Sequence, residues 1–423
     1  MTFKVGDLFT GRKNDGTLGP QGVAILNGLE TSAHASGTFQ VKAGDGVASF
    51  ARALNFAASP MEHVPTVTWA ATTATGLTSP VEYRPQKCGL GSQTVGWDGL
   101  SDPNFRYFPG TFSTANGGST DLALQGDIKP GGNAQAARWP LVAEFVTDAA
   151  NAVVEIVVYF LYAAQSFQVE VNGQYLWGGA YIPPMQGNSN SARMTLTFPV
   201  AASRRIRIST QGLAYVRVPT GGSISKPTTT IGRRIALVGD SWVNGSSGSS
   251  LDPPGTINTE TFPWQLARLM GADSIIAAGI GGTGWVAGMD GATPNPYSTR
   301  LSAVLAMNPQ VIVFVGSIND GAGTGVQAAV QDALATCASV PEIYVMGPPL
   351  PSYGPNLAAV KAGVAAAGNA KHIDLTSAFA GSTGNITAPS SNRSAMLMPD
   401  NAHPTKYGHA YLAEQAYRSI LNS

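Results

Sequence analysis

The sequence has few charged residues and few cysteines. Asp, Glu, Lys and Arg make up 12% of the 423 residues, about half the share that is usual in globular proteins. The 25 acidic residues balance the 25 basic ones, and the basic residues form no cluster. This balance argues against nucleic acid or an anionic membrane surface as the main partner.

The cysteines and the apolar segments exclude further classes. Cys88 and Cys337 lie far apart and outside any metal-ligating pattern, so we expect neither a disulfide framework nor a metal site. The longest apolar stretch, residues 152–164, contains Glu155 and is too short and too rich in β-branched residues for a membrane helix. Polar residues follow Met1 closely, so we expect no secretory signal.

Glycine and apolar side chains are abundant. The chain contains 50 glycines and 28 prolines, and 43% of its residues are hydrophobic. A chain of this length suffices for two or three domains, each with its own core. The composition is typical of a β-rich protein with many loops and an uncharged polar surface, such as an extracellular or virion protein.

The clearest boundary is a segment rich in Ser, Thr, Pro and Gly at 218–230. Beyond it, strand-like and helix-like segments alternate, which predicts a parallel sheet between layers of helices. The predicted strands are 235–238, 275–278, 311–315, 342–346 and 372–375. The predicted helices are 264–270, 326–338, 357–367 and 406–421. We therefore assign residues 229–423 to one α/β domain.

Before this boundary, apolar and polar residues alternate with a period of two. Residues 167–171 turn at Asn172 and Gly173 into 175–177, which predicts a β-hairpin. No helical period competes with this pattern. We predict a β-sandwich of jelly-roll type over residues 61–228.

The first 60 residues are polar and glycine-rich around one helix-like segment at 47–57. We assign residues 1–60 to a connector or attachment segment. With the low charge and the absence of a secretory signal, such a segment suggests a virion component, for instance of a phage tail, attached through its N-terminus. A cytoplasmic location and a homo-oligomer stay open.

A Gly-Asp-Ser motif, with its serine at position 241, ends the apolar run 235–238. A serine at the carboxyl end of a buried parallel strand lies where α/β sheets bind their ligands, and it needs a base to act as a nucleophile. Of the five histidines, His403 is the one with a nearby orienting carboxylate, Asp400, at D-x-x-H spacing. On one turn, this carboxylate can accept the Nδ1 proton and leave Nε2 directed to Ser241.

Two further segments carry donors for the oxyanion of a tetrahedral intermediate. Residues 279–284, named here the glycine turn, contain four glycines whose backbone amides a substrate can approach closely. Asn319 follows another apolar run, 311–315, and its side chain can donate from a fixed position. Asp320 is more consistent with a loop cap than with a catalytic acid.

The motifs Gly-Asp-Ser, glycine turn, Asn-Asp and D-x-x-H-P, in this order, resemble those of the SGNH (GDSL-type) hydrolases. The resemblance implies a flavodoxin-like three-layer fold and an ester hydrolase that needs no metal or organic cofactor. It implies Ser241 as the nucleophile, His403 as the general base and Asp400 as its orienter. It also implies an oxyanion hole formed by the amides of Ser241 and Gly282 and the side chain of Asn319.

Some details depart from the family pattern. The third motif is usually G-x-N-D, whereas Ser317 stands two positions before Asn319 here. The glycine turn follows alanines where the family often has Asn, so Gly279 and Gly281 remain alternatives to Gly282.

The glycine turn also satisfies the G-x-G-x-x-G pattern of dinucleotide-binding folds. That fingerprint should open a helix at once and meet an acidic residue about 20 positions further on. An irregular stretch with Asp290 and Pro294 follows instead, which argues against a dinucleotide.

Three other side chains near the motifs have two interpretations each. Trp242 and Trp285 flank the predicted site, where they either stack on a sugar ring or pack in the core. His409, on the last predicted helix, is more consistent with a surface or packing residue than with a second base.

We therefore expect a serine esterase that hydrolyses O-acetyl groups on a polysaccharide through an acyl-enzyme. Some carbohydrate esterases that resemble the SGNH group carry a sandwich before the hydrolase domain, which favours a glycan substrate. A short-chain lipid or aryl ester hydrolase is the alternative within the same chemistry. A glycan-binding phage tail component without catalysis is the alternative from a different class, although such a protein would have no reason to keep Ser241, Asp400 and His403 together.

Overall fold

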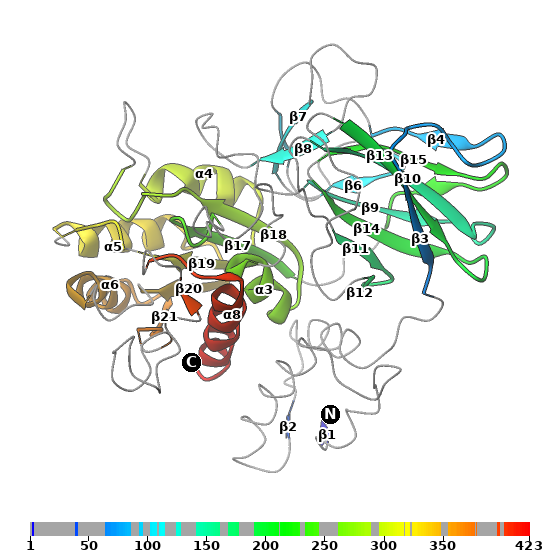
Figure 1. Ribbon diagram of the computed structural model, residues 1–423. Coiled ribbons are helices and arrows are strands. Elements are labelled where there is room, and N and C mark those ends of the chain that lie inside the picture. The colour runs from blue at the N-terminus through cyan, green and yellow to red at the C-terminus, as the bar shows by residue number, and fades with distance from the viewer. Residues whose placement is uncertain are drawn as a thin grey trace. The chain divides into compact units, whose positions relative to one another are not determined.

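The computed structural model describes about half of the first 210 residues and most of the residues that follow (Figure 1). The described residues are 2–3, 39–40, 64–85, 93–95, 102–107, 110–114, 124–127, 141–160, 168–176, 190–210, 212–228, 233–244, 261–288, 296–316, 318–321, 324–347, 354–376, 378, 396–397 and 402–423. The chain divides into two compact units, and its main boundary lies between Gly232 and Arg233. They are named here the upstream and the downstream unit.

The upstream unit contains two antiparallel sheets. The first has the strand order β3-β13-β10-β15-β8-β7-β5, with β4 paired to β15. Its strands are β3 (Thr66–Ala70), β4 (Val81–Tyr83), β5 (Gln93–Val95), β7 (Gly110–Thr114), β8 (Leu124–Asp127), β10 (Val153–Phe160), β13 (Asn190–Thr197) and β15 (Leu213–Val218).

The second sheet has the order β12-β11-β14-β9-β16, with β6 paired to β9. Its strands are β6 (Arg106–Tyr107), β9 (Leu141–Thr147), β11 (Gln168–Val171), β12 (Gln174–Tyr175), β14 (Arg204–Thr210) and β16 (Ile224–Ser225). Two further short strands, β1 (Thr2–Phe3) and β2 (Phe39–Gln40), pair with each other. The predicted helix at 47–57 lies outside the described residues.

The two sheets share one hydrophobic core. Ile156 and Val158 of β10 are buried in the same cluster as Phe145 of β9 and Ile206 of β14. Alternate residues of a strand face opposite sides, so each sheet contributes every second side chain to this core. The jelly-roll connectivity stays a prediction, because several segments between these strands lie outside the described residues.

The predicted hairpin is confirmed. β11 pairs with β12 across Asn172 and Gly173, whose φ angles are 52° and 81°. Two consecutive positive φ angles define the type I′ turn that joins twisted strands, and Asn-Gly adopts it at low cost.

The predicted linker at 218–230 is partly wrong. Ile224 and Ser225 form β16, which pairs with Thr147 and Val146 of β9, and the Ile224 side chain is buried in the shared core. One apolar residue in a polar segment was enough to anchor this part of the chain to the sheet.

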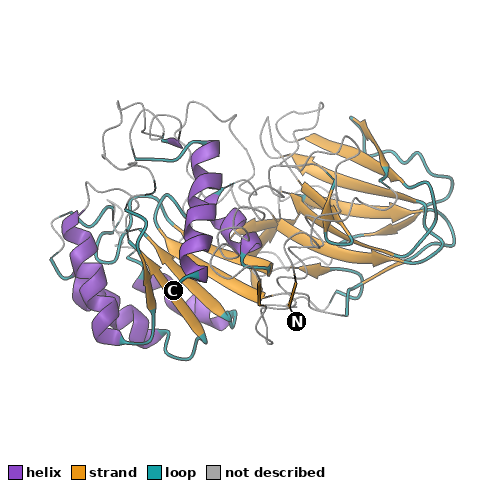
Figure 2. Ribbon diagram, turned by 90° about the horizontal axis from the view of Figure 1, so that it is seen from below, coloured by secondary structure: helices purple, strands orange, loops and turns teal. Residues whose placement is uncertain are grey.

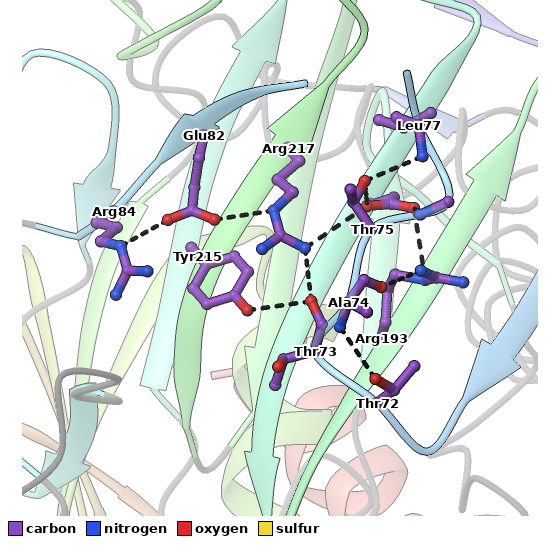
Figure 3. A network of polar contacts seen from close by, with 12 residues as sticks. Thr72, Thr73, Ala74, Thr75, Leu77, Glu82, Arg84, Arg193, Tyr215 and Arg217 are labelled. Atoms are coloured by element: carbon purple, nitrogen blue, oxygen red, sulfur yellow. Dashed lines mark hydrogen bonds and ion pairs between the residues drawn. The ribbon is translucent and has the colours of Figure 1, made fainter. Parts of the chain in front are cut away.

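On the other side of the first sheet, residues 72–79 cross the strands and are held by charged side chains (Figure 3). Glu155 of β10 is 1% exposed and accepts hydrogen bonds from the Thr75 hydroxyl and the Gly76 amide, each at 2.8 Å. Arg193 lies 3.4 Å from the same carboxylate, and Arg217 donates to the Thr73 carbonyl. The one acidic residue of the long apolar strand is therefore buried with its partners, as a buried charge requires.

The downstream unit is the predicted α/β fold. Its five strands are all parallel, in the order β18-β17-β19-β20-β21. They are β17 (Arg233–Gly239), β18 (Ala272–Gly279), β19 (Val311–Val315), β20 (Glu342–Met346) and β21 (Lys371–Ile373). The helices are α3 (Phe262–Leu269), α4 (Ser298–Ala306), α5 (Val326–Thr336), α6 (Gly354–Ala367) and α8 (Lys406–Leu421).

Helices cover both faces of this sheet (Figure 2). α3 packs against α8, whereas α4, α5 and α6 form a second packed group. The strand order 2-1-3-4-5 is that of flavodoxin-like folds, as the family resemblance implied. Among the described residues, no helix combines the length and the apolar character needed to cross a membrane.

This topology determines where a ligand can bind. The chain leaves β17 for β18 on one side and reaches β19 on the other, so the strand order reverses next to β17. In such sheets, the crevice at the carboxyl ends of the strands beside this reversal is the usual binding site. Gly-Asp-Ser, the glycine turn and Asn319 follow β17, β18 and β19 in that order.

All five predicted strands and all four predicted helices of this unit are confirmed, with shifts of a few residues at their ends. The prediction missed α4. This helix has only nine residues and places a charged side chain, Arg300, among the buried residues of its inner face, so its apolar pattern is interrupted.

Candidate active site

Ser241 lies in a tight turn directly after β17. The four residues 235–238 of that strand are completely buried, and the chain then turns so that the Asn244 amide donates to the Asp240 carbonyl at 2.9 Å. The Asp240 carboxylate accepts from the Trp242 amide at 2.9 Å and so caps the turn. Ser241 itself is 8% exposed, which makes it the most accessible of the three residues 240–242.

The packing around this turn requires glycine on the neighbouring strands. A Cβ on Gly279, at the end of β18, would lie 2.2 Å from the Asn244 amide nitrogen. Gly316, just after β19, has a φ of 127°, and a Cβ there would lie 2.4 Å from Asp240 Oδ2. Gly279 therefore serves the close approach of the turn to β18, a structural purpose that is separate from oxyanion binding.

Asp240 is a completely buried carboxylic acid next to the candidate nucleophile. Burial raises the pKa of its carboxyl group to about 7, against the opposing effects of the Trp242 amide and the Arg300 charge. Asp240 therefore keeps its proton to a higher pH than an exposed carboxyl group does, and its protonation depends on the fold around it.

The glycine turn begins with a hydrogen-bonded bend. The Thr283 amide and the Thr283 hydroxyl both donate to the Ile280 carbonyl, at 3.4 and 2.7 Å. Gly282 is the third residue of this bend and has a φ of 75°, a value that explains why glycine stands there. Gly282 is exposed, whereas Gly281 is half-buried. The assignment of the Gly282 amide to an oxyanion hole stays a prediction.

Asn319 and the glycine turn are brought together. The Asn319 side-chain amide donates to the Thr283 carbonyl at 2.9 Å. A primary amide carries two hydrogens, so a second one remains for another acceptor. Ser317, the residue that departs from the family pattern, lies outside the described residues.

Asp320 caps a loop, as expected. Its carboxylate accepts from the amides of Trp285, Val286 and Ala287, at 2.9 to 3.1 Å. Asp320 is 8% exposed, and three donors on one carboxylate leave it little capacity for acid catalysis. It fixes the segment that follows the glycine turn beside Asn319.

The structure adds Arg300 and Tyr297, which the sequence interpretation missed. Both belong to the start of α4, and both are almost completely buried. The Tyr297 hydroxyl donates to the Val315 carbonyl at 3.0 Å, and the Arg300 guanidinium lies 5.1 Å from the Tyr297 ring centre. Tyr297, Arg300, Leu301 and Val304 are spaced to lie on one face of a helix. A charged residue on this otherwise apolar face was the sequence signal that could have identified Arg300.

His403 lies just before α8 and is half-buried. The segment is held by a hydrogen bond from the Thr405 amide to the Met396 carbonyl at 2.8 Å, and the Thr405 hydroxyl caps α8 by accepting from the Gly408 amide. The contact between His403 and Ser241 stays a prediction. Asp400 lies outside the described residues, so its pairing with His403 is not tested.

His409 is a packing residue, one of the two interpretations expected for it. It lies on α8 and is 2% exposed, and its Nδ1 accepts from the Phe262 amide at the start of α3 at 3.1 Å. Burial, together with the charge of His403, lowers the pKa of His409 to about 3. His409 is therefore neutral at physiological pH and joins α8 to α3.

The two tryptophans are core residues. Trp242 is 1% exposed and Trp285 is 2% exposed. The Trp285 ring packs 5.0 Å from the rings of both Tyr297 and Phe314. A ring enclosed in this way has no free face for a sugar, so the expectation that Trp242 and Trp285 bind substrate is not supported and core packing is the better interpretation.

The segment that follows β18 also argues against a dinucleotide site. Turns and bends follow β18 from residue 281 to 286, and α4 begins only at Ser298. A dinucleotide fingerprint would place a helix N-terminus at the turn to receive the pyrophosphate.

The comparisons with known proteins support the family resemblance found in the sequence. Residues 237–411 match the model of the GDSL-like lipase/acylhydrolase family. The downstream unit therefore carries a GDSL-like hydrolase domain. No match was found among curated proteins.

Two solved structures share the fold. The salicylyl-acyltransferase SsfX3 from a tetracycline biosynthetic pathway is 15% identical, with a TM-score of 0.54, over 78% of this chain and 98% of that one. An active-site mutant of a family two carbohydrate esterase from Clostridium thermocellum is 16% identical, with a TM-score of 0.50, over 76% of this chain and 98% of that one. At these identities the likeness is one of fold.

Proposed function

We propose that the downstream unit hydrolyses carboxylic esters through an acyl-enzyme on Ser241, with O-acetyl groups of a polysaccharide as the preferred substrate. The observation that carries this proposal is the placement of Ser241, the glycine turn and Asn319 at the carboxyl ends of β17, β18 and β19, with the latter two joined by a hydrogen bond. The GDSL-like domain supports the reaction class.

In the proposed reaction, the Ser241 Oγ attacks the ester carbonyl while His403 takes its proton. The oxyanion of the tetrahedral intermediate accepts from the amides of Ser241 and Gly282 and from the second hydrogen of the Asn319 side chain. His403 then protonates the departing alcohol, and a water molecule releases the acid from Ser241 in the same manner. Asp400 holds the His403 ring in the required tautomer.

The choice of a polysaccharide rests on weaker support than the choice of an ester. It comes from the antiparallel sheets of the upstream unit and from the fold shared with a family two carbohydrate esterase. The two tryptophans no longer contribute to it, since both are buried. A short-chain lipid or aryl ester remains the alternative substrate.

The test is acetate release from p-nitrophenyl acetate and from acetylated polysaccharides by the wild type and Ser241→Ala. We expect Ser241→Ala to lose at least about 10³-fold in kcat, as for other serine nucleophiles. Ser209→Ala is the matched control, because Ser209 is a buried serine of the upstream unit, 4% exposed, and its loss should leave kcat unchanged.

Other outcomes separate the alternatives. Release that Ser241→Ala leaves unchanged would contradict the acyl-enzyme, and glycan binding without any serine-dependent release would favour a non-catalytic glycan-binding protein. The shared fold with an acyltransferase makes a third assay informative, in which an added alcohol competes with water. Ester formation in excess of acid release would change the proposal from hydrolysis to acyl transfer.

A further inference from the structure

Arg300 is a buried cation that contacts the segments carrying Ser241 and the glycine turn. Its side chain is 1% exposed, and one guanidinium nitrogen donates to two backbone carbonyls, those of Gly239 and Ala278, each at 2.8 Å. The other terminal nitrogen donates to the Thr283 hydroxyl at 3.0 Å. The planar guanidinium thus joins the end of β17 to the end of β18 and to the glycine turn that follows β18.

These two segments carry two of the proposed oxyanion donors, the amides of Ser241 and Gly282. Gly239 is the last residue of β17, two positions before Ser241, and Ala278 precedes the glycine turn at the end of β18. Thr283 follows Gly282, and its carbonyl accepts from Asn319. Arg300 therefore hydrogen-bonds to the segments that carry Ser241 and Gly282, and it is linked to Asn319 through Thr283.

The neighbouring Tyr297 completes this anchorage. Its hydroxyl donates to Val315 at the end of β19, so the first turn of α4 holds the carboxyl ends of β17, β18 and β19 together. The Gly239 carbonyl also accepts from the Ile280 amide at 3.1 Å, so Arg300 is a second donor to it.

The charge of Arg300 is retained in this environment. Burial lowers the pKa of the Arg300 guanidinium to about 10, and Tyr297 and Asp240 oppose this effect. The group is therefore protonated at neutral pH. A fixed positive charge beneath donors that face a developing oxyanion favours that oxyanion, most strongly where water is excluded.

We propose that Arg300 is a positioning residue for ester hydrolysis, which holds the glycine turn against the end of β17 in the register that the oxyanion donors require. It touches neither substrate nor reacting atoms and acts through Gly239, Ala278 and Thr283. Because this inference rests on the proposed function, its test must separate the two.

The experiment compares the wild type with Arg300→Lys, Thr283→Val and Arg300→Met in three measurements. The first is kcat and KM for p-nitrophenyl acetate, with the folded fraction checked by circular dichroism. The second is the rate at which a fluorophosphonate labels Ser241, because its phosphoryl oxygen occupies the same hole. The third is hydrogen exchange of the amides at 280–287.

We expect kcat and the labelling rate to fall together by about 10- to 100-fold in Arg300→Lys and Thr283→Val, below the loss for a direct donor, with KM nearly unchanged and faster exchange at 280–287. Thr283→Val removes the hydrogen bond from Arg300 together with the bond from the Thr283 hydroxyl to the Ile280 carbonyl, but no buried charge. It therefore remains informative if Arg300→Met does not fold, whereas Arg300→Lys keeps the Thr283 hydroxyl and its bond to Ile280. Arg204→Met is the matched control. Arg204 is 4% exposed and donates to the carbonyls of Asn151 and Ala202 in the upstream unit, and its loss should lower stability without changing kcat.

Two results would overturn the role of Arg300, and a third would overturn the proposed function. Normal kcat in folded Arg300→Lys and Thr283→Val, beside a serine-dependent wild type, overturns the role of Arg300 and leaves the esterase intact. A fall in kcat that Arg204→Met reproduces reduces that role to general stability and also overturns it. A wild type without serine-dependent turnover or labelling ends the proposed function and the catalytic part of the inference, while exchange at 280–287 still decides whether Arg300 anchors the turn.

Discussion

At the scale of the residue, Asp240 is a carboxylic acid whose protonation is strongly determined by its surroundings. The side chain is completely buried, and Arg300 and Asp320 are the charged groups that act on it. A carboxyl group whose pKa is 3.8 when exposed and about 7 when folded holds a proton in the folded protein between these values, and loses it in the unfolded chain.

This difference predicts a pH-dependent contribution to stability. The folded form binds more protons than the unfolded form between about pH 4 and pH 7. The contribution of Asp240 to the free energy of unfolding therefore falls as the pH rises through this window, by up to about 1.4 kcal/mol per pH unit. Asn at position 240 keeps the acceptor for the Trp242 amide and removes the titration.

The measurement is urea unfolding of the wild type and Asp240→Asn at pH 5 and pH 8. We expect the wild type to lose stability relative to Asp240→Asn between the two pH values. An equal difference at both would show that the Asp240 carboxyl group has an ordinary pKa in the folded protein. A change of the opposite sign would show a lowered pKa, as a close ion pair with Arg300 would produce.

At the scale of the element, the second sheet of the upstream unit carries a row of charges across its strands. Arg106 of β6 and Arg207 of β14 stand opposite Glu144 of β9 in the register, and Glu170 of β11 stands opposite Arg207. The Glu144 carboxylate lies 3.6 Å from Arg106, 2.5 Å from Arg205 and 3.2 Å from Arg207. Glu144 therefore contacts three guanidinium groups, and one of them, that of Arg207, also lies 3.7 Å from Glu170.

Removal of that carboxylate should destabilise the upstream unit. Glu144 is 2% exposed, and loss of one partner from a buried ion pair commonly costs about 3–5 kcal/mol, because the remaining charge stays buried. We expect Glu144→Gln to lower the free energy of unfolding by about 3 kcal/mol. Denaturant unfolding monitored by circular dichroism measures this change.

The control is Glu414→Gln. Glu414 pairs with Arg418 one turn further along α8, with both side chains partly exposed, and such a pair is worth at most about 0.5 kcal/mol. Similar losses for Glu144→Gln and Glu414→Gln would show that the charge row contributes no more than a surface pair.

At the scale of the whole molecule, the balance of charge predicts how the protein behaves in solution. The formal net charge is zero and the pI is about 7.0, so electrostatic repulsion between copies is weakest near neutral pH. We expect a solubility minimum near pH 7, and elution from a heparin column without retention at about 0.1 M salt.

Light scattering across pH 5 to 9 and the heparin elution profile check both expectations. Retention on heparin that is lost as salt is raised would reveal a basic surface that the overall composition does not indicate. It would reopen an anionic polymer as a partner or substrate.

Much of the downstream unit could be predicted from the sequence because its patterns are local. A fully buried parallel strand is a short apolar run, and the turn residues that end it are Gly, Asp, Ser and Asn. Ser241, the glycine turn and Asn319 were therefore identified from motifs, and their common edge of the sheet follows from the alternation of strands and helices. The confirmed Asn172-Gly173 hairpin is equally local.

Tertiary structure decided what depends on contacts between distant residues. It decided that Trp242 and Trp285 pack in the core, that Asp320 accepts from three amides of another loop and that Arg300 joins the ends of two strands to Thr283. None of these follows from neighbouring residues, because burial and hydrogen-bond partners are set by segments that meet only in the folded chain. The sequence by itself determined which candidate catalytic side chains are present, and the packing of α4 against the sheet decided which buried side chains contact the segments that carry them.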